Sequence, residues 1–164
     1  MSFHLGNQAG DGNSSNHVSH GGNGSSNGGN PTPYQNRSES WNGSSWTSRT
    51  STLNQATGVS TYAGNDTSGI MIGGRDTGYD SLRTVEKWNG SSMTDVANLP
   101  AYYARSRCAG NDTKALSWNG RYSSDGSDGG SLTNHQLQYD GTTWTTKSNM
   151  PVTVESPNAG GEGL

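Results

Sequence analysis

Two groups of residues have the types and spacing that metal binding requires. His17 and His20 are three positions apart, a spacing at which two imidazoles on a helix can hold one metal ion. Their surroundings show no helical pattern, so we expect a solvated histidine pair. Residues 125–130 (DGSDGG) alternate carboxylates with small residues but lack the later acidic ligand of a calcium loop. We therefore predict no metal site and no cofactor.

Catalytic groupings are not recognisable in the sequence. Serine, histidine and aspartate do not recur at a spacing typical of a nucleophilic triad. Carboxylates do not occupy matched positions that would suggest glycoside hydrolysis. The sequence therefore predicts a protein that is not an enzyme and has no catalytic residues. Cys108 is the single cysteine, so an internal disulfide is excluded.

Aromatic and arginine side chains are the remaining candidates for binding chemistry. Tyr79 and Tyr122 lie in predicted loops, and Arg75 and Arg121 precede them closely. Tyrosine rings stack on sugars, and arginine supplies hydrogen bonds. We take these four residues as the candidate ligand-binding set, with a glycan as the ligand.

Composition narrows the class of protein. The 164 residues carry a net charge of only −3, with 26% hydrophobic residues, 25 glycines, five tryptophans and seven tyrosines. Disorder combines low hydrophobicity with high net charge and few aromatics, so short strands around a thin core fit better. The chain shows no basic cluster for nucleic acid and no apolar stretch of membrane-spanning length.

The N-terminus shows no signal-peptide pattern, although the Asn/Gly/Ser/Thr-rich composition is typical of an extracellular surface. A virion component released by lysis, or a protein secreted by a non-standard route, reconciles the two observations. We expect a virion or extracellular location.

One hairpin motif organises the chain and recurs three times. It reads WNGSSWT at residues 41–47, WNGSSMT at 88–94 and YDGTTWT at 139–145. Asn-Gly and Asp-Gly favour a two-residue turn, which would place Trp41 opposite Ser44 and Trp46 on the same face as Trp41. The paired large side chains are expected to be buried between adjacent units.

Further landmarks fix the period of the repeat. The hairpins begin 47 residues apart (88 − 41) and then 51 apart (139 − 88). Residues 63–67 (AGNDT) recur at 109–113, and residues 72–75 (IGGR) align with 118–121 (WNGR), both 46 apart (109 − 63, 118 − 72). Periods of this length indicate propellers or solenoids. The positions that define the repeat are Trp41, Asn42, Gly43, Trp46, Gly73, Gly74, Trp88, Asn89, Gly90, Tyr139, Asp140, Gly141 and Trp144.

Each complete repeat predicts four short strands. In the first these are about 59–63, 69–73, 82–88 and 91–96, and in the second about 104–109, 114–118, 133–139 and 142–145, with a longer loop at 122–131. Residues 34–53 supply only a half unit, whose missing strands must come from the C-terminal segment 152–155 or from another chain. The resulting organisation is an irregular Gly/Asn/Ser-rich arm at 1–33, repeats at 34–151 (34–53, 54–100 and 101–151) and a tail at 152–164.

The repeat resembles a kelch or galactose-oxidase-like β-propeller blade, with a diglycine after the second strand and an aromatic pair around the last turn. The WNGSSWT form is similar to kelch-like repeats of bacteriophage tail and appendage proteins. Residues 139–144 also resemble the Asp-box hairpin of sialidases, which is structural. A galactose-oxidase copper centre is not implied here: Cys108 lies near Tyr102 and Tyr103, but His135 is the single histidine in the repeats.

The resemblance implies an all-β, partial propeller of about two complete blades with loose end strands. A closed propeller needs at least about four blades, so the chain is expected to form a homo-oligomer or to join other virion subunits. The expected role is a non-enzymatic structural or adhesive subunit of an extracellular assembly, such as a phage tail, fibre or decoration protein. The alternative is a small oligomeric lectin that binds surface glycans.

Overall fold

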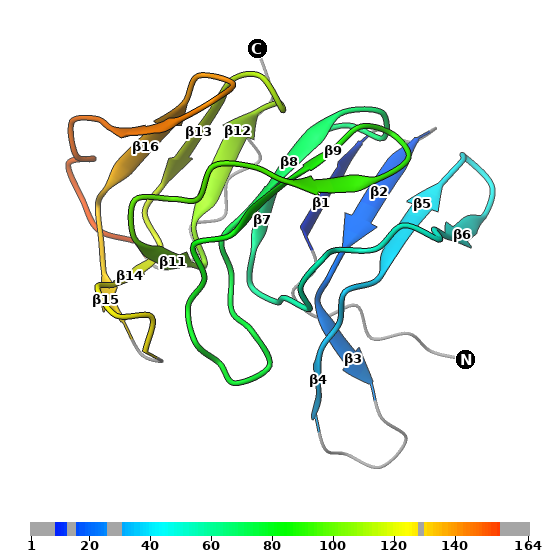
Figure 1. The fold of residues 1–164 in the computed structure, drawn as a ribbon, viewed down its shortest axis with the longest axis horizontal. Helices are drawn as coiled ribbons and strands as arrows, with labels where there is room; N and C mark the ends of the chain where they lie inside the picture. Colours follow the sequence, from blue (N-terminus) through cyan, green and yellow to red (C-terminus); the bar gives the residue numbers. More distant parts are fainter. Residues whose placement is uncertain (1–8, 13–15, 26–30, 128–129, 155–164) are drawn as a thin grey trace.

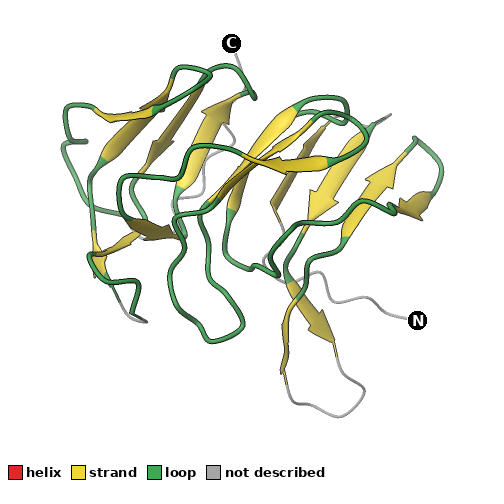
Figure 2. Ribbon diagram, viewed as in Figure 1, coloured by secondary structure: helices red, strands yellow, loops and turns green. Residues whose placement is uncertain are grey.

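The computed structural model describes residues 9–12, 16–25, 31–127 and 130–154 (Figure 1). Over these ranges the chain forms 17 strands in antiparallel sheets and no helix (Figure 2). The described residues thus include no helix that could cross a membrane. The expectation of an all-β protein is confirmed.

Three four-stranded sheets follow one another along the chain. The first sheet contains β1 (Ala9–Gly12), β2 (His17–His20), β5 (Ser38–Trp41) and β6 (Trp46–Ser48). The second contains β7 (Thr61–Gly64), β8 (Gly69–Ile72), β9 (Val85–Trp88) and β10 (Met93–Asp95). The third contains β12 (Arg107–Gly110), β13 (Ala115–Trp118), β16 (Gln136–Tyr139) and β17 (Trp144–Thr146). The edge strand β7 contacts the edge strands β1 and β12, so the edges of the three sheets lie next to one another (Figure 1).

Smaller elements extend from one end of these sheets. β3 (Asn23–Ser25) and β4 (Pro31–Tyr34) form a hairpin. β11 (Tyr102–Ala104), β14 (Arg121–Ser123) and β15 (Ser131–Leu132) form a three-stranded sheet. Part of the segment predicted as the loop 122–131 therefore belongs to strands.

The strand pairs at the centre of the three sheets share one register. His17 pairs with Trp41, Gly69 with Trp88, and Ala115 with Tyr139. Each residue of β2 thus has an equivalent in β8 and β13. Because side chains alternate along a strand, equivalent residues point to the same face of their sheets.

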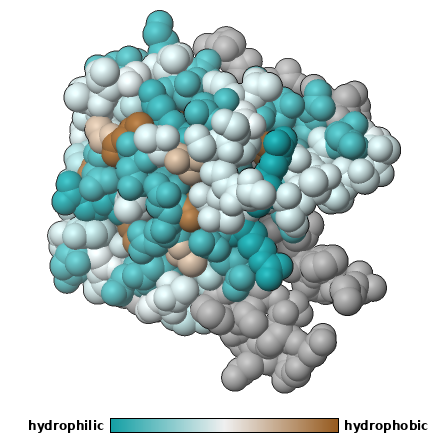
Figure 3. All heavy atoms as spheres, turned by 45° about the vertical axis from the view of Figure 1, so that its right-hand side comes forward, coloured by the Kyte–Doolittle hydropathy of each residue, from teal (hydrophilic) through white to brown (hydrophobic). Residues whose placement is uncertain are grey.

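Two hydrophobic cores fill the spaces between neighbouring sheets. The core between the first and second sheets contains Val18, Leu53, Tyr62, Met71, Trp88 and Met93. The core between the second and third contains Ala63, Ile70, Ile72, Val85, Leu99, Tyr103, Ala115, Leu137 and Tyr139. The surface is mostly hydrophilic in the view of Figure 3, with small separate hydrophobic spots. Burial between sheets, at about 25 cal/mol per Å² of apolar area, is therefore the main stabilising term.

A pair of residues with positive φ follows the second strand of each of the three four-stranded sheets. The pairs are Gly21-Gly22, Gly73-Gly74 and Asn119-Gly120, with φ of 65° and 95°, 55° and 114°, and 55° and 89°. The second N–H of each pair donates to a carbonyl outside its sheet: Gly22 to Thr57, Gly74 to Tyr103 and Gly120 to Val154, at 2.8, 2.9 and 3.3 Å. The first two carbonyls lie on the segment that enters the next sheet. The pair therefore links neighbouring sheets through the backbone.

The prediction of an irregular arm at residues 1–33 is wrong for its described part. β1 and β2 complete the first sheet, so residues 34–53 are not a half unit, and the chain holds three four-stranded sheets in place of two. The segment was missed because Val18 is the one apolar residue of β2, while His20 and Ser19 are buried polar residues. Gly21-Gly22 was the overlooked sign of the repeat.

The predicted geometry of the repeated hairpin is also wrong. Trp41 pairs directly with Trp46, and the four residues 42–45 form the loop. The Asn42 side-chain carbonyl accepts the backbone N–H groups of Ser44 and Ser45 at 3.0 and 2.9 Å, and only Gly43 takes a positive φ, of 92°. A two-residue type I′ turn would need positive φ at both central positions. Asn89 and Asp140 accept the same two bonds in their loops.

Trp41 and Trp46 are not buried between sheets as expected. Trp41 is half-buried and Trp46 is 47% exposed, because the face of the first sheet that carries them is not covered by another sheet of the described chain. The eight strands predicted for the two complete repeats are all present, with ends shifted by a few residues. Residues 152–154 form no strand, and residue 155 lies outside the described ranges.

Replacing Gly74 by Ala tests the role of the glycine pair. A Cβ at Gly74 would lie 2.5 Å from Thr57 Oγ1 and 2.8 Å from the Gly58 carbonyl oxygen, on a backbone with φ of 114°. We expect Gly74→Ala to lower the free energy of unfolding by about 2–4 kcal/mol in urea denaturation.

Gly78→Ala is the matched control. Its Cβ would meet only Asp76 Oδ1, at 3.2 Å, and Gly78 does not have a positive φ. We expect a change within about 0.5 kcal/mol. Equal losses in the two variants would contradict the role given to the pair.

Candidate functional site

Three loops lie along one end of the sheets, and we call this surface the loop face (Figure 1). Each begins after the positive-φ pair of its sheet: the first includes β3 and β4, the second is residues 75–82, and the third includes β14 and β15. Neighbouring loops touch, because the Ser81 N–H donates to the Gly126 carbonyl at 2.7 Å. The loop face carries the four residues predicted to bind a ligand.

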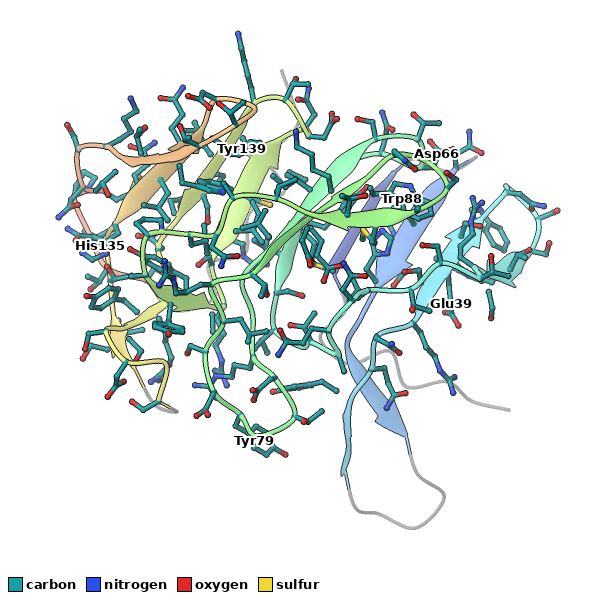
Figure 4. All side chains as sticks on the ribbon, in the orientation of Figure 1. Glu39, Asp66, Tyr79, Trp88, His135 and Tyr139 are labelled. Atoms are coloured by element: carbon teal, nitrogen blue, oxygen red, sulfur yellow. The ribbon has the colours of Figure 1, made fainter. Side chains whose placement is uncertain are left out.

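Tyr79 is the most exposed of these residues. Its side chain is 45% exposed and lies at the tip of the second loop, away from the sheets (Figure 4). The Tyr79 backbone has φ of 70°, an unusual value for a bulky residue. Asp76 holds this conformation: its carbonyl accepts the Tyr79 N–H at 2.9 Å, and its Oδ1 accepts the N–H groups of Gly78 and Asp80 at 2.8 and 3.1 Å.

Tyr34 supports the Tyr79 ring from the neighbouring loop. The two ring centroids are 5.7 Å apart with planes at 71°, an edge-to-face contact. Tyr34 is buried against Gly58, where a Cβ would come within 2.2 Å of the tyrosine ring. The Tyr79 ring is therefore exposed to solvent, and the buried Tyr34 ring supports it from below.

Tyr122 lies in a second aromatic group on the loop face. Its ring centroid is 5.6 Å from that of Tyr103 and 5.1 Å from that of His135. A hydrogen bond of 3.0 Å joins the Tyr103 hydroxyl to His135 Nδ1. Burial, followed by the electrostatic effect of Tyr122, raises the pKa of Tyr103 to about 12. Tyr122 is half-buried in this group and offers less ring surface than Tyr79.

The two arginines of the predicted set have structural contacts. Arg75 is buried, and its backbone forms β-bridges with Gly58 and Ser81. Arg121 Nη1 donates to the Gly130 carbonyl at 3.0 Å. The structure thus brings all four predicted residues to one face but in two groups, Tyr79 with Arg75 and Tyr122 with Arg121. Their ligand-binding role stays a prediction.

Sequence reasoning missed several residues of the loop face. Tyr34 and Tyr103 were not singled out, nor was Arg83, whose guanidinium lies 5.6 Å from the Tyr102 ring centroid. Alignment of Gly21-Gly22 with Gly73-Gly74 would have identified the first loop and Tyr34 with it.

His17 and His20 do not form a solvated pair or a helical metal site. They lie on the strand β2 three positions apart, and therefore point to opposite faces. His17 contacts the Trp46 ring, whereas His20 is buried against Tyr62 and Trp88. His20 Nδ1 is 2.9 Å from Ser38 Oγ, and its Nε2 has no hydrogen-bond partner in the described part of the chain. Burial is the main cause that lowers the His20 pKa to about 4, followed by the charges of His17 and Arg49.

Asp125, at the start of the segment 125–130, bonds to residues of its own loop. Its Oδ1 accepts the Ser123 hydroxyl at 2.8 Å and the Ser127 N–H at 3.0 Å. These bonds, led by that from the Ser127 backbone, lower the Asp125 pKa to about 2. Asp128 lies outside the described residues, among which no cluster of three or more His, Cys, Asp or Glu could hold a metal ion.

Comparison with known proteins identifies a fold but no family. No protein-family model and no curated protein matches the sequence. A solved structure titled "Structure of YjhT" matches with a TM-score of 0.73 at 13% sequence identity, over 90% of this chain and 54% of that chain. The chain therefore spans about half the length of YjhT, and the likeness is one of fold.

Buried His20 predicts a specific loss of stability in acid. The unfolded state binds a proton at this residue below pH 6.5, whereas the native state does so only near pH 4. Because the native pKa of His20 is depressed, the contribution of its neutral imidazole to the free energy of unfolding is fully present above pH 6.5. It is lost as the pH falls to about 4. We expect a loss of at most roughly 3 kcal/mol in the free energy of unfolding.

Urea denaturation at several pH values between 7.5 and 4 measures this loss. The His20→Gln variant cannot take up the proton and serves as the control, since all other titrating groups remain. The wild-type chain should lose more stability over this range than the variant. Parallel pH profiles would show that His20 does not titrate as its burial requires.

Proposed function

We propose that the chain is a non-enzymatic structural or adhesive subunit of an extracellular assembly. Its sheets are kelch-like blades of an incomplete propeller. The form of the repeated hairpin favours a bacteriophage virion, as a tail, fibre or decoration protein. Support comes from three four-stranded sheets in chain order and from the two cores that pack them face to face.

The observation that carries this proposal is the exposure of side chains at the two end sheets. Trp46 occupies the position that Met93 holds in the second sheet, and Met93 is 8% exposed against 47% for Trp46. At the other end, Leu116 is 37% exposed, whereas its equivalents Val18 and Ile70 are each 0% exposed. A subunit that docks at both ends would bury both residues.

The contacts of the loop face favour a non-enzymatic role. With a pKa of about 12, the Tyr103 hydroxyl holds its proton near neutral pH and is poorly suited to general acid–base work. Its bond to His135 Nδ1 also engages the imidazole. The Tyr103 hydroxyl and the His135 imidazole are thus engaged with each other.

A lectin is the second candidate function, and Tyr79 is the observation that favours it. An exposed ring, fixed by Tyr34 and by the turn that Asp76 closes, resembles the aromatic surfaces on which sugars stack. A glycan-binding subunit could also be part of an assembly, since adhesion to a cell surface needs such a site.

Immunogold labelling tests the main proposal. Antibodies raised against the purified chain would be applied to extracellular particles from its source, and the particles imaged in negative stain. We expect gold at an appendage or at the particle surface. Exclusive recovery of the chain in particle-free intracellular fractions would refute the assembly role.

Replacing Tyr79 by Ala tests the lectin alternative on a glycan array. Loss of the stacking ring should weaken binding of any recognised glycan by about fivefold or more, because aromatic stacking contributes on the order of 1 kcal/mol or above. Leu132→Ala, which removes another exposed side chain of the loop face, should leave binding unchanged. Absence of glycan binding by the wild-type chain, or equal loss in both variants, would exclude Tyr79 as the sugar site.

A further inference from the structure

The three sheets present equivalent faces in a fixed direction along the molecule. Val18 of the first sheet packs in the core toward the second sheet, and its equivalent Ile70 packs toward the third. Trp88 packs back toward the first sheet, and its equivalent Tyr139 packs back toward the second. Each sheet therefore has a forward face and a backward face, and every internal junction joins a forward face to a backward face.

One forward face and one backward face remain at the ends. The end forward face belongs to the third sheet and carries Leu116, Trp118 and Gln138. The end backward face belongs to the first sheet and carries Trp41, Trp46 and His17. Their positions follow from the shared register of β2, β8 and β13 with their partners.

The end faces carry residues suited to the same junction. Trp41 is the equivalent of Trp88 and Tyr139, which are each 1% exposed inside the molecule. Trp46 packs beside Trp41, with ring centroids 5.8 Å apart, and His17 packs edge-on against Trp46. Leu116 and Trp118 supply the apolar side chains that Ile70 and Ile72 supply in the second sheet.

The junction of the second and third sheets shows what a further junction would contain. Lys87 of the forward face lies 5.1 Å from the Tyr139 ring centroid, and its Nζ donates to the Gly141 carbonyl at 3.2 Å. The equivalent of Lys87 on the end forward face is Gln138. The equivalents of Tyr139 and Gly141 on the end backward face are Trp41 and the loop residue Gly43.

We propose that the end forward face of one chain packs on the end backward face of a second copy, and that two copies close a ring of six sheets. This inference rests on the proposed function, since it names the partner of the incomplete propeller. Closed propellers have about four to eight blades, and six is the multiple of three in that range.

The segment after β17 supports continuation beyond the third sheet. The Gly120 N–H donates to the Val154 carbonyl, as the Gly74 N–H does to Tyr103 on the way into the third sheet. The end forward face therefore already has the backbone link that accompanies the internal junctions. A second copy seated there would continue the same packing.

Two charge-introducing variants test the ring, each confined to one end face. Trp46→Glu alters the backward face, and Leu116→Glu alters the forward face. Both positions are exposed in the single chain, so the fold should persist, as circular dichroism would verify. Thr94→Glu is the matched control, at an exposed position on β10 of the second sheet, which belongs to neither end face.

Size-exclusion chromatography with light scattering at micromolar concentration gives the readout. The wild-type chain and Thr94→Glu should have twice the mass of one chain, and each face variant alone should be monomeric because both of its junctions are damaged. An equimolar mixture of the two face variants should recover a dimer, since one of its two junctions is intact. Back-to-back pairing of like faces would instead leave one face variant dimeric and would show no recovery on mixing.

A gain-of-function variant tests the register of the junction. Gln138→Lys places an ammonium where Lys87 lies, within reach of Trp41 and Gly43 of the second copy. Tryptophan is the strongest cation–π partner. We therefore expect the dissociation constant of the dimer to fall roughly 2- to 10-fold. Thr145→Lys, on the neighbouring strand β17, should have no such effect, and unchanged affinity in both variants would refute the proposed register.

Failure of the ring and failure of the proposed function are distinguishable. A monomeric wild-type chain that the antibodies nonetheless locate on particles would refute the ring and leave the assembly role standing. A dimer with the predicted mixing behaviour that is absent from particles would refute the role and leave the ring standing.

Discussion

The backbone link between successive sheets is the constraint on which the rest of the structure depends. A positive-φ pair follows the second strand of each four-stranded sheet and directs one N–H to a carbonyl outside that sheet. The first two of these carbonyls precede the following sheet, so the hydrogen bond holds the entry to each following sheet against the sheet before it. Trp88 and Tyr139 can then occupy the same place in successive cores. The chain has few hydrophobic residues, and it uses them in the same kind of junction between each pair of neighbouring sheets.

The same constraint explains where variation is tolerated. Each loop of the loop face begins directly after a positive-φ pair, outside the strands that build the cores. The hairpin loops at the opposite end of the sheets vary little, because Asn42, Asn89 and Asp140 each accept two backbone N–H groups. Binding chemistry can therefore change at the loop face while the junctions stay constant. Tyr79 and its supporting Tyr34 lie on this face.

Sequence reasoning predicted the repeat, the all-β class and the strands of residues 54–151, because large side chains and Asn-Gly loops recur at one period. It missed β1 and β2, because burial there involves His20, Ser19 and Ser38, which composition assigns to solvent. It named four candidate ligand residues in loops that follow the same landmark in two repeats, and their ligand-binding role stays a prediction. It could not give their exposure, because the burial of Arg75 depends on backbone bridges to Gly58 and Ser81. Trp46 was expected to be buried between adjacent units of the repeat, and its exposure reflects the place of its sheet at the end of the row.

The central claim is that the end faces are junctions of the same kind as the internal ones. Hydroxyl-radical footprinting of Trp46 at increasing protein concentration tests it most directly, with buried Trp88 as the internal reference. The account predicts that Trp46 oxidation falls toward the level of Trp88 as copies associate. Oxidation of Trp46 at a constant rate, as expected for a side chain that stays 47% exposed at every concentration, would contradict it.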